Sequence, residues 1–377
     1  MGGLSAANMM RLGFIVPGGL DHLSGGFLYD RMLVKHLRAS GWQVEVLPFH
    51  WGSYVGDLLQ NLPRTSRGGF DPVSLDLLLE DELSHPALLA FNRRLRRETD
   101  VPIIAIVHHL RSSEARPAWM NALYRRVERS YFGDVDGAVC NSLATRRSVE
   151  ALWADSRPSV VAYPGRGEPE RHINAEDIQT RAFRAGPLNL IFLGNIIPRK
   201  GLLTLLDALA AIMELDWRLE VVGDLSVDPA HVRRIRRAIR ARGLDQRVAL
   251  AGRLDEASLA VRLAQAQVMV VPATYEGFGI AYLDGMGFGL PAVATAVGGA
   301  AELVHHRHNG LLVPPDDTNA LARGLAGLMN DRRALSEMGV AALETYRRHP
   351  SWSDSAALVR RFLVEFQHKA GQLAMAG

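Results

Sequence analysis

Short apolar runs alternate with longer amphipathic stretches along the first half of the chain. The runs that predict strands lie at 11–17, 42–49, 75–81, 102–108 and 137–142. Between the first two, residues 27–41 carry apolar positions at helical spacing and stop at Gly41, which predicts a helix. Strands that alternate with helices are typical of a parallel sheet wrapped by crossover helices. We therefore predict an α/β fold for this half.

The same alternation restarts after residue 187. Further strands are predicted at 188–194, 217–223, 247–252, 268–273, 291–295 and 310–314. Helices are predicted between them at 201–213, 231–243 and 257–266. Two successive doubly wound α/β halves are the simplest interpretation. Because ligands of such sheets bind at the carboxyl ends of the strands, we expect a site in a cleft between the halves.

Residues 163–187 lose the apolar period and gain proline, glycine and charge, which is typical of a linker. At 377 residues the chain also exceeds the roughly 250 to 300 residues at which a single core stops growing. We therefore predict an N-terminal domain over 1–183 and a C-terminal domain over 184–351. A C-terminal helix at about 352–370 is then available to pack back on the first domain.

Composition is that of a folded, water-soluble protein, with 48% hydrophobic and 22% charged residues. The longest apolar runs fall far short of the roughly 20 residues that span a bilayer. The first residues lack the features of a signal peptide, and the single Cys140 cannot form an internal disulfide. We expect a cytoplasmic protein and leave open peripheral contact with the inner membrane face.

Basic residues gather at 92–98 and 231–242, although the formal net charge is only +3. Such clusters can meet phosphates or anionic lipid, and the alternative is a solvated helix face. Of the 43 basic residues only three are lysines, namely Lys35, Lys200 and Lys369. The lysine kept at 200, inside an Arg-Lys-Gly turn, is therefore of interest.

The stretch TYEGFGIAYLDGMGFGLP, residues 274–291, combines five glycines with two carboxylates. Gly277 and Gly279 let the backbone approach a ligand closely, and they precede a predicted helix whose first amides attract anions. Glu276 and Asp284 are acceptors suited to pairs of neighbouring hydroxyl groups. This pattern predicts a site for a sugar and a ribose. A strand-to-helix turn whose glycines serve packing is the alternative.

The turn GNIIPRKG, residues 194–201, follows a predicted strand and precedes a predicted helix. Arg199 and Lys200 therefore lie at the carboxyl edge of the second sheet, where they can neutralise a diphosphate and stabilise its departure without a metal. An exposed basic turn is the alternative. This turn and residues 274–291 support one another because both fall at the same edge of one domain.

The N-terminal half offers weaker signals. The loop PGGLDHLSGG lacks the spacing of a dinucleotide fingerprint, so Gly25 and Gly26 fit either close approach of a ligand or a plain turn. His108 ends an apolar strand and His109 follows it. A histidine at that position can hydrogen-bond a substrate hydroxyl, and a packed or exposed histidine pair is the alternative.

Neither of two further motifs predicts a metal site. Asp-Val-Asp at 134–136 merely precedes a strand, and His-His-Arg-His at 305–308 has no spaced partner ligands. We expect no metal and no other cofactor.

Taken together, these stretches resemble glycosyltransferase family 4, the retaining GT-B enzymes also described as glycosyl transferases group 1. YEGFGIAYLDGMGFGLPAVATAVGGAAELV resembles the family's E-x7-E region, and HNGLLVPPDD, GNIIPRKG, SGGFLYDRMLVKHLRASGWQVEV and PIIAIVHHL also have the family's form. The resemblance is strongest over 188–320. It implies the GT-B architecture, with two Rossmann-like doubly wound domains facing across a cleft.

In the C-terminal half, the resemblance implies that Glu276 lies beside the hydroxyls of a donor sugar. It implies that the amides of Gly277, Phe278 and Gly279 lie near the sugar and its phosphate. Asp284 occupies the place of the second glutamate, which in the family holds the ribose. The aspartate keeps the charge but is shorter by one carbon-carbon bond, about 1.5 Å, which puts its reach in doubt.

The resemblance also assigns roles to residues at strand ends. It implies that Arg199 and Lys200 bind the diphosphate, that His108 lies near the reacting sugar and that Gly26 is a close-approach glycine. It implies that Arg253 neighbours the nucleobase. YPGRGEP, where relatives usually carry Pro-Asn-Gly, is a second departure from the family's pattern.

The function implied is transfer of a sugar from a nucleoside-diphosphate sugar to a hydroxyl acceptor, with retention of configuration and by front-face displacement. The acceptor is expected to be a glycan, a lipid-linked or a small molecule, read around 50–70 and 108–130. One alternative is a nucleoside-diphosphate-sugar epimerase of the same architecture. A more remote one is a nucleic-acid-binding protein that uses the helix at 231–242, which the low net charge disfavours; we expect no nucleic-acid partner.

Overall fold

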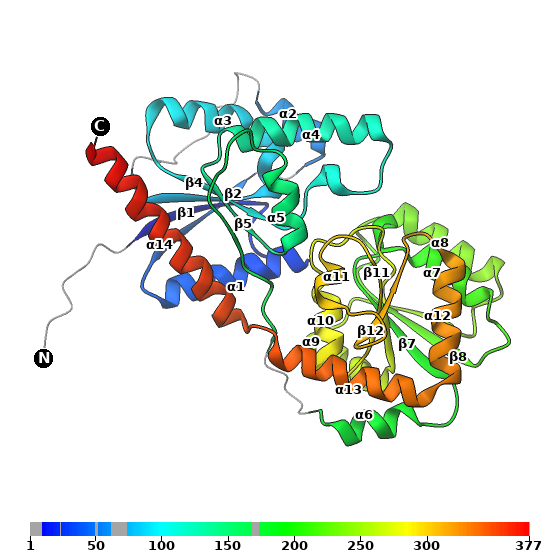
Figure 1. Ribbon diagram of the computed structural model, residues 1–377. Helices are drawn as coiled ribbons and strands as arrows, with labels where there is room; N and C mark the ends of the chain where they lie inside the picture. The colour runs from blue at the N-terminus through cyan, green and yellow to red at the C-terminus, as the bar shows by residue number, and fades with distance from the viewer. Residues whose placement is uncertain (1–9, 23, 50–51, 62–73, 168–172, 377) are drawn as a thin grey trace, which may run out of the picture. The chain divides into compact units, whose positions relative to one another are not determined.

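The computed structural model describes residues 10–22, 24–49, 52–61, 74–167 and 173–376. The chain divides into two compact units (Figure 1). Unit 1 comprises Met1–Gly165 together with Pro350–Gly377, and unit 2 comprises Arg166–His349.

Unit 1 is built on a parallel sheet in which the strands are ordered β2-β1-β3-β4-β5-β6. The strands are β1 (Arg11–Pro17), β2 (Gln43–Phe49), β3 (Leu77–Asp81), β4 (Ile103–Val107), β5 (Gly137–Cys140) and β6 (Ser159–Val161). The first five confirm the strands predicted from the apolar runs. The chain leaves β1 for one side of the sheet and returns to β3 on the other side. The crevice at the carboxyl ends of β1 and β3 is therefore where such a sheet receives ligands.

Helices cover both faces of this sheet. They are α1 (Gly25–Ala39), α2 (Tyr54–Leu59), α3 (His85–Glu98), α4 (Ala118–Gly133), α5 (Leu143–Glu150) and α14 (Trp352–Ala376), with short 3₁₀ turns η2 (Glu82–Ser84) and η3 (Arg111–Ser113). On one face α14 packs against α1, and Val359 and Leu363 join the core there (Figure 1). On the other face the buried core includes Leu88, Tyr131 and Phe132. Burial on both faces explains why the central strands are apolar without a break.

Unit 2 contains a second parallel sheet, ordered β12-β11-β10-β7-β8-β9. Its strands are β7 (Leu188–Leu193), β8 (Trp217–Val222), β9 (Val248–Gly252), β10 (Val268–Val270), β11 (Ala292–Thr295) and β12 (Gly310–Val313). The strand order reverses between β7 and β10, which is the doubly wound order of dinucleotide-binding sheets. Residues that follow β7 and β10 therefore meet at one crevice.

The helices of unit 2 include those predicted from periodicity. They are α6 (Ala175–Ala182), α7 (Leu202–Ala210), α8 (Pro229–Ala241), α9 (Glu256–Gln265), α10 (Ile280–Gly287), α11 (Ala300–Leu303), α12 (Thr318–Asn330) and α13 (Arg332–Arg348), with a 3₁₀ turn η4 (Pro198–Lys200). In α8 the Asp228 side chain caps the first turn, Pro229 opens it, and Val232 and Ile235 are buried. The arginines of α8 lie on its exposed face.

The segment predicted as a linker, 163–187, contains a helix. Asn174 and Asp177 form a capping box that starts α6, and Ile178 is buried. The buried Arg181 donates to the carbonyl groups of Phe288 and Gly289, at 2.7 and 3.0 Å. The linker prediction did not foresee α6, because this helix is too short for its apolar positions to show a period.

Residues 166–183, placed in the first domain by the sequence analysis, group with unit 2, and α14 groups with unit 1. Within the described residues, no helix is both long and apolar enough to cross a membrane. Parts of the expected acceptor region, residues 50–51 and 62–70, lie outside the described part of the chain.

Candidate functional site

The basic turn after β7 is fixed by glycines. Gly201 ends η4 with a φ of 72°, and a Cβ there would lie 2.0 Å from the carbonyl oxygen of Pro272. Gly194 precedes the turn with a φ of 150°, which other residues rarely adopt, and the aliphatic part of the Lys200 side chain lies 3.4 Å from where its Cβ would be. Both positions therefore exclude larger residues, and the lysine is directed back across the end of its own strand.

Lys200 and Arg199 converge on Glu276, which follows β10. Lys200 Nζ donates to Glu276 Oε1, and Arg199 Nη1 lies 3.8 Å from the same oxygen. Arg199 also donates to the carbonyl oxygen of Tyr275 at 2.6 Å. The side chains are 15%, 19% and 10% exposed for Lys200, Arg199 and Glu276. Two cations thus face one carboxylate at a site from which water is partly excluded. The three side chains together carry a net positive charge, which can attract an anion.

Burial lowers the pKa of Lys200, and Glu276 opposes that shift. The lysine is thus held near its carboxylate partner at a cost in solvation. An anionic ligand that approaches the same cation would restore part of the lost stabilisation.

Gly298 and Gly299, which were not singled out from the sequence, pack against the backbone of Glu276 and Gly277. The amide of Gly299 donates to the carbonyl oxygen of Glu276 at 2.9 Å. A Cβ at Gly298 would lie 2.0 Å from that oxygen, and one at Gly299 would lie 2.1 Å from the carbonyl oxygen of Gly277. Two consecutive glycines before α11 were the available signal. Their contact with Glu276 could not be seen in sequence because 22 positions separate them.

The turn from Glu276 into α10 depends on Gly279. It has a φ of 101°, and a Cβ there would lie 2.3 Å from the ring of Tyr282. The Tyr282 hydroxyl donates to the carbonyl oxygen of Val271 at 2.6 Å, which ties α10 to β10. The side chain of Phe278 is buried, with its ring 5.5 Å from that of His349. The helix predicted after these glycines is present, and Gly279 is the N-cap of α10.

Asp284 lies on α10 and is half-buried. Its pKa is raised to about 7, first by burial and then by the charge of Glu256 at the start of α9. Within the described residues it makes no hydrogen bond or ion pair. Arg253 is exposed directly after β9, at the same edge of the sheet as Lys200 and two strands away from β7. At about 4.8 Å between strands, this is roughly 10 Å.

In unit 1, His108 follows β4, and polar contacts hold its ring Nε2, its amide and its carbonyl oxygen. Its Nε2 lies 3.2 Å from Asp30 Oδ1 on α1. Its amide donates to Glu82 Oε2 at 2.8 Å, and its carbonyl oxygen accepts from Asn141 at 2.8 Å. A Cβ at Gly26 would lie 2.9 Å from the ring, so this glycine makes room for the imidazole.

Gly26 therefore has a packing reason to be glycine that the sequence analysis did not foresee. Gly25 is exposed at the start of α1. His109 points to a different partner, since its Nε2 lies 3.1 Å from Glu114 Oε1.

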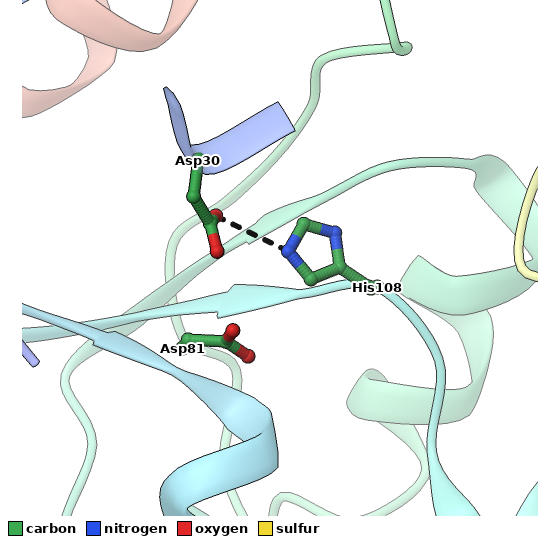
Figure 2. A group of neighbouring side chains, drawn as sticks. All are labelled: Asp30, Asp81 and His108. Atoms are coloured by element: carbon green, nitrogen blue, oxygen red, sulfur yellow. Dashed lines mark hydrogen bonds and ion pairs between the residues drawn. The ribbon is translucent and has the colours of Figure 1, made fainter. Parts of the chain in front are cut away.

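Asp81, at the end of β3, completes a buried group with Asp30 and His108 (Figure 2). One ligand-type atom of each residue lies within 4.8 Å of the others, and both carboxyl groups are fully buried. Burial raises the pKa of Asp30 to about 7, and that of Asp81 is well above its usual range, first through burial and then through Asp30. Neither aspartate was singled out from the sequence, because nothing local distinguishes them.

The two motifs that were not predicted to bind a metal, at 134–136 and 305–308, contact other residues. Asp136 pairs with Arg96 and accepts from the amide of Ile103 at 2.7 Å. His306 Nδ1 accepts from the amide of Leu312 at 3.1 Å. These contacts give both motifs a structural role.

Known proteins resemble the chain over most of its length. Residues 187–331 match the family model described as Glycosyl transferases group 1. The chain is 27% identical to a phosphatidyl-myo-inositol mannosyltransferase of Mycobacterium leprae, with 93% of this chain and 96% of the relative covered. It is 24% identical to a glycogen synthase of Mycobacterium tuberculosis over 73% of this chain and 64% of that relative.

Solved structures share the fold. Sucrose-phosphate synthase from Thermosynechococcus elongatus matches with a TM-score of 0.75 and 21% identity, over 95% of this chain and 99% of that one. Anabaena HepE, solved in complex with UDP-glucose, matches with a TM-score of 0.72 and 18% identity, over 94% and 100%. These are glycosyltransferases of the GT-B fold class, and the two doubly wound sheets agree with that class. Residues 187–331 therefore match the glycosyl transferases group 1 family, and the chain is a glycosyltransferase.

Proposed function

We propose that this enzyme moves a sugar from a nucleoside-diphosphate sugar to a hydroxyl acceptor, with retention of configuration and without a metal. The observation that carries the proposal is the meeting of Lys200, Arg199 and Glu276 where the strand order of unit 2 reverses. The surplus positive charge suits a diphosphate, and the carboxylate suits the hydroxyls of the sugar attached to it. That HepE was solved with UDP-glucose supports a donor of this class.

The nucleoside would extend from this point along the same edge of the sheet. Asp284 is available to accept hydrogen bonds from the ribose hydroxyls, because it has no partner within the described residues. Arg253, exposed after β9, would neighbour the base. The amides of Gly277, Phe278 and Gly279, at the start of α10, would face the sugar and its phosphate.

The reaction would proceed on one face of the sugar. As the bond between the anomeric carbon and the leaving phosphate oxygen lengthens, the acceptor hydroxyl oxygen forms its bond from the same side. The hydroxyl proton passes to the departing phosphate. Lys200 and Arg199 would stabilise the negative charge that develops on the diphosphate, and His108 would hydrogen-bond a hydroxyl of the reacting sugar.

The acceptor class follows from a surface of unit 1, which we name the α2–α4 patch. Four large apolar side chains are exposed there, Val55 and Leu59 on α2 and Trp119 and Leu123 on α4, at 58 to 65%. The helices adjoin, since the rings of Tyr54 and Tyr124 are 4.8 Å apart. Exposed Arg125 and Arg126 continue α4.

Aromatic and aliphatic residues beside arginines suit the surface of an anionic membrane. We propose that the enzyme works on an acceptor presented there. The name of the Mycobacterium leprae relative, a phosphatidyl-myo-inositol mannosyltransferase, supports a lipid-linked acceptor.

A donor screen tests the proposal. The enzyme is incubated in EDTA with a panel of nucleotide sugars and extracts of glycan and lipid acceptors, and the anomeric configuration of any product is read by NMR. Transfer with the donor's configuration kept is expected. Inversion, or a requirement for a divalent ion, would contradict the mechanism.

The same donors without acceptor test the alternative reaction. Isomerisation of the sugar would favour the epimerase, a reading that the names of the matched relatives do not favour. Hydrolysis or no change is the expected result.

Vesicle flotation tests the membrane surface. Binding to vesicles of phosphatidylglycerol and phosphatidylcholine is expected, and Trp119→Ser with Leu123→Ser should reduce it severalfold. The matched control replaces Val227 and Val261, which are 53% and 54% exposed in unit 2, by serine. Equal loss in both pairs would contradict a role for the patch.

A further inference from the structure

The buried group of Asp30, Asp81 and His108 contains two carboxyl groups that have no role in the proposed reaction. Asp30 comes from α1 and Asp81 from the end of β3, and both lie on the Nε2 side of the His108 ring (Figure 2). Asp30 Oδ2 and Asp81 Oδ2 are both buried, and no donor group among the described residues reaches either of them. A carboxylate oxygen left this way is costly, so the two atoms require either a proton or a cation between them.

A shared proton fits this place better than a cation. A carboxylate oxygen of Asp30 lies within 4.8 Å of one of Asp81. Both are fully buried, and two like charges in contact in a dry interior cannot both ionise. One proton between Asp30 and Asp81 satisfies both orphaned oxygens and leaves a single negative charge on the pair.

That charge decides which nitrogen of His108 carries the proton. Burial lowers the pKa of His108, which keeps the ring neutral. Its Nε2 lies 3.2 Å from Asp30 Oδ1, and a neutral ring can approach a carboxylate at that distance only by donating an N–H. The hydrogen is then on Nε2, and Nδ1 keeps a lone pair.

The ring has little freedom to change this arrangement. Gly26 lies against one part of the ring, and the Tyr29 ring meets it edge-on at 5.4 Å between centroids. Nδ1 points away from both aspartates (Figure 2), and it makes no hydrogen bond to the described residues. It is the one polar atom of His108 left for a ligand.

We propose that Asp30 and Asp81, by sharing one proton, are positioning residues that hold His108 as the neutral Nε2–H tautomer and present Nδ1 as an acceptor for a hydroxyl of the donor sugar. That this hydroxyl belongs to a donor sugar rests on the proposed function. The tautomer itself does not, so the two can fail separately.

Other titratable groups act on this centre from every neighbouring element. They are Tyr29 and Arg31 on α1, Glu82 on η2, Glu128 on α4 and Cys140 on β5. None of them contacts Nδ1. A pH profile must therefore be interpreted against variants of the pair rather than by itself.

The first test is spectroscopic and needs no substrate. Enzyme labelled with ¹⁵N-histidine is examined by long-range proton–nitrogen correlation at pH 7, with His108→Gln to assign the signals. A protonated Nε2 and an unprotonated Nδ1 are expected. The opposite tautomer, an imidazolium ring, or a stoichiometric metal ion found by elemental analysis would overturn the proposal.

The second test is kinetic. Asp30→Asn keeps the shape but removes the charge, so it should mix the tautomers and lower turnover about 10- to 100-fold, the scale of one lost hydrogen bond to a ligand. The matched control is Glu80→Gln, a carboxyl equally buried on β3 that accepts from Asn92 rather than His108. Glu80→Gln should keep the tautomer and turn over within about twofold of wild type.

The results of the two tests are interpreted together. An Asp30→Asn enzyme with an unchanged tautomer and a turnover equal to that of Glu80→Gln would overturn the proposal. If Asp30→Asn does not fold, the spectrum of the wild type still decides. If no nucleotide sugar supports transfer but the Nε2–H tautomer is found, the proposed function fails while the positioning role stands.

Discussion

In unit 2, the residues that follow β7 and β10 bring two cations to one carboxylate. In unit 1, the corresponding crevice collects carboxyl groups around a histidine. The buried acids of its described part are Asp30, Asp57, Glu80, Asp81, Glu82 and Glu128, and no lysine or arginine there is buried. Both places lie where a strand order reverses, so topology alone does not distinguish them.

The difference lies in what neutralises the buried charge. In unit 2 the counter-charges are fixed side chains, and the surplus is positive, so the site is prepared for an anion before one arrives. In unit 1 burial shifts four of the acids toward their protonated forms: the pKa of Asp30 and of Glu80 is raised to about 7, and that of Asp81 and of Glu82 is raised well above the usual range. Unit 2 should therefore be sensitive to loss of a cation, and unit 1 to pH.

The largest effect is expected from Lys200→Ala. Loss of the cation nearest the diphosphate should lower kcat about 10²- to 10³-fold, as for other groups that stabilise charge in a transition state. Steady-state kinetics with the donor identified in the screen measures this. Lys35→Ala removes an exposed lysine of α1 and serves as the control. Turnover near that of Lys35→Ala would remove Lys200 from the mechanism.

Lys200→Ala also leaves Glu276 buried without its main partner, which can cost stability on its own. The double variant Lys200→Met with Glu276→Gln removes both charges at once. Recovery of the melting temperature without recovery of kcat would assign the loss to catalysis.

Gly298→Ala should follow in size. A methyl group there would meet the carbonyl oxygen of Glu276, so the loop that carries this carboxylate must shift, at about 1 to 3 kcal/mol. Donor affinity should fall about tenfold or more. Gly243→Ala has a φ of 66° but nothing within 4 Å, and it controls for backbone strain alone. Equal effects of both substitutions would mean that contact with Glu276 does not matter.

Donor affinity is expected to depend on pH because the charge of Asp284 changes near neutral pH. With a pKa of about 7, it is only partly ionised in neutral solution. Ribose hydroxyls donate to the ionised form, so donor affinity should rise with pH through about 7 and fall up to about tenfold per unit below it. Calorimetry with a nucleotide sugar avoids a terminal phosphate that titrates near pH 6.

Asp284→Asn should flatten that profile. A profile as steep as that of the wild type would exclude Asp284 as its source. Asp284→Glu asks whether the pocket is built around the shorter side chain, since a marked loss of donor affinity would show that it is.

The smallest effect on activity is expected from Glu80→Gln, which instead changes stability. Burial raises the pKa of Glu80 from 4.5 to about 7. The folded state therefore binds this proton more tightly than the unfolded state, so its stabilising contribution is complete below about pH 4.5 and is lost as pH rises through about 7. Denaturant unfolding from pH 4 to 8 should show a decline about 1 to 3 kcal/mol smaller for the variant. Parallel profiles would contradict an acid neutralised by its proton.

The sequence by itself determined the two α/β halves, because central strands such as β4 and β10 are buried on both faces and so form apolar runs. It also determined that Arg199, Lys200, Glu276 and His108 follow strands, at the carboxyl edge of a parallel sheet, where ligands of such sheets bind. It did not determine α6, whose apolar positions are too few for a period, nor the unit that holds residues 166–183.

Only the tertiary structure decided which of those residues meet. Lys200 and Glu276 are 76 positions apart, and Asp30 and His108 are 78 apart. Their contacts depend on the order of strands in each sheet, which local pattern does not encode. For the same reason nothing local in the sequence distinguished Asp30 or Asp81, and the Gly298–Gly299 pair did not reveal its contact with Glu276. A buried carboxyl or a closely packed glycine acquires its role only from the atoms that another part of the chain places against it.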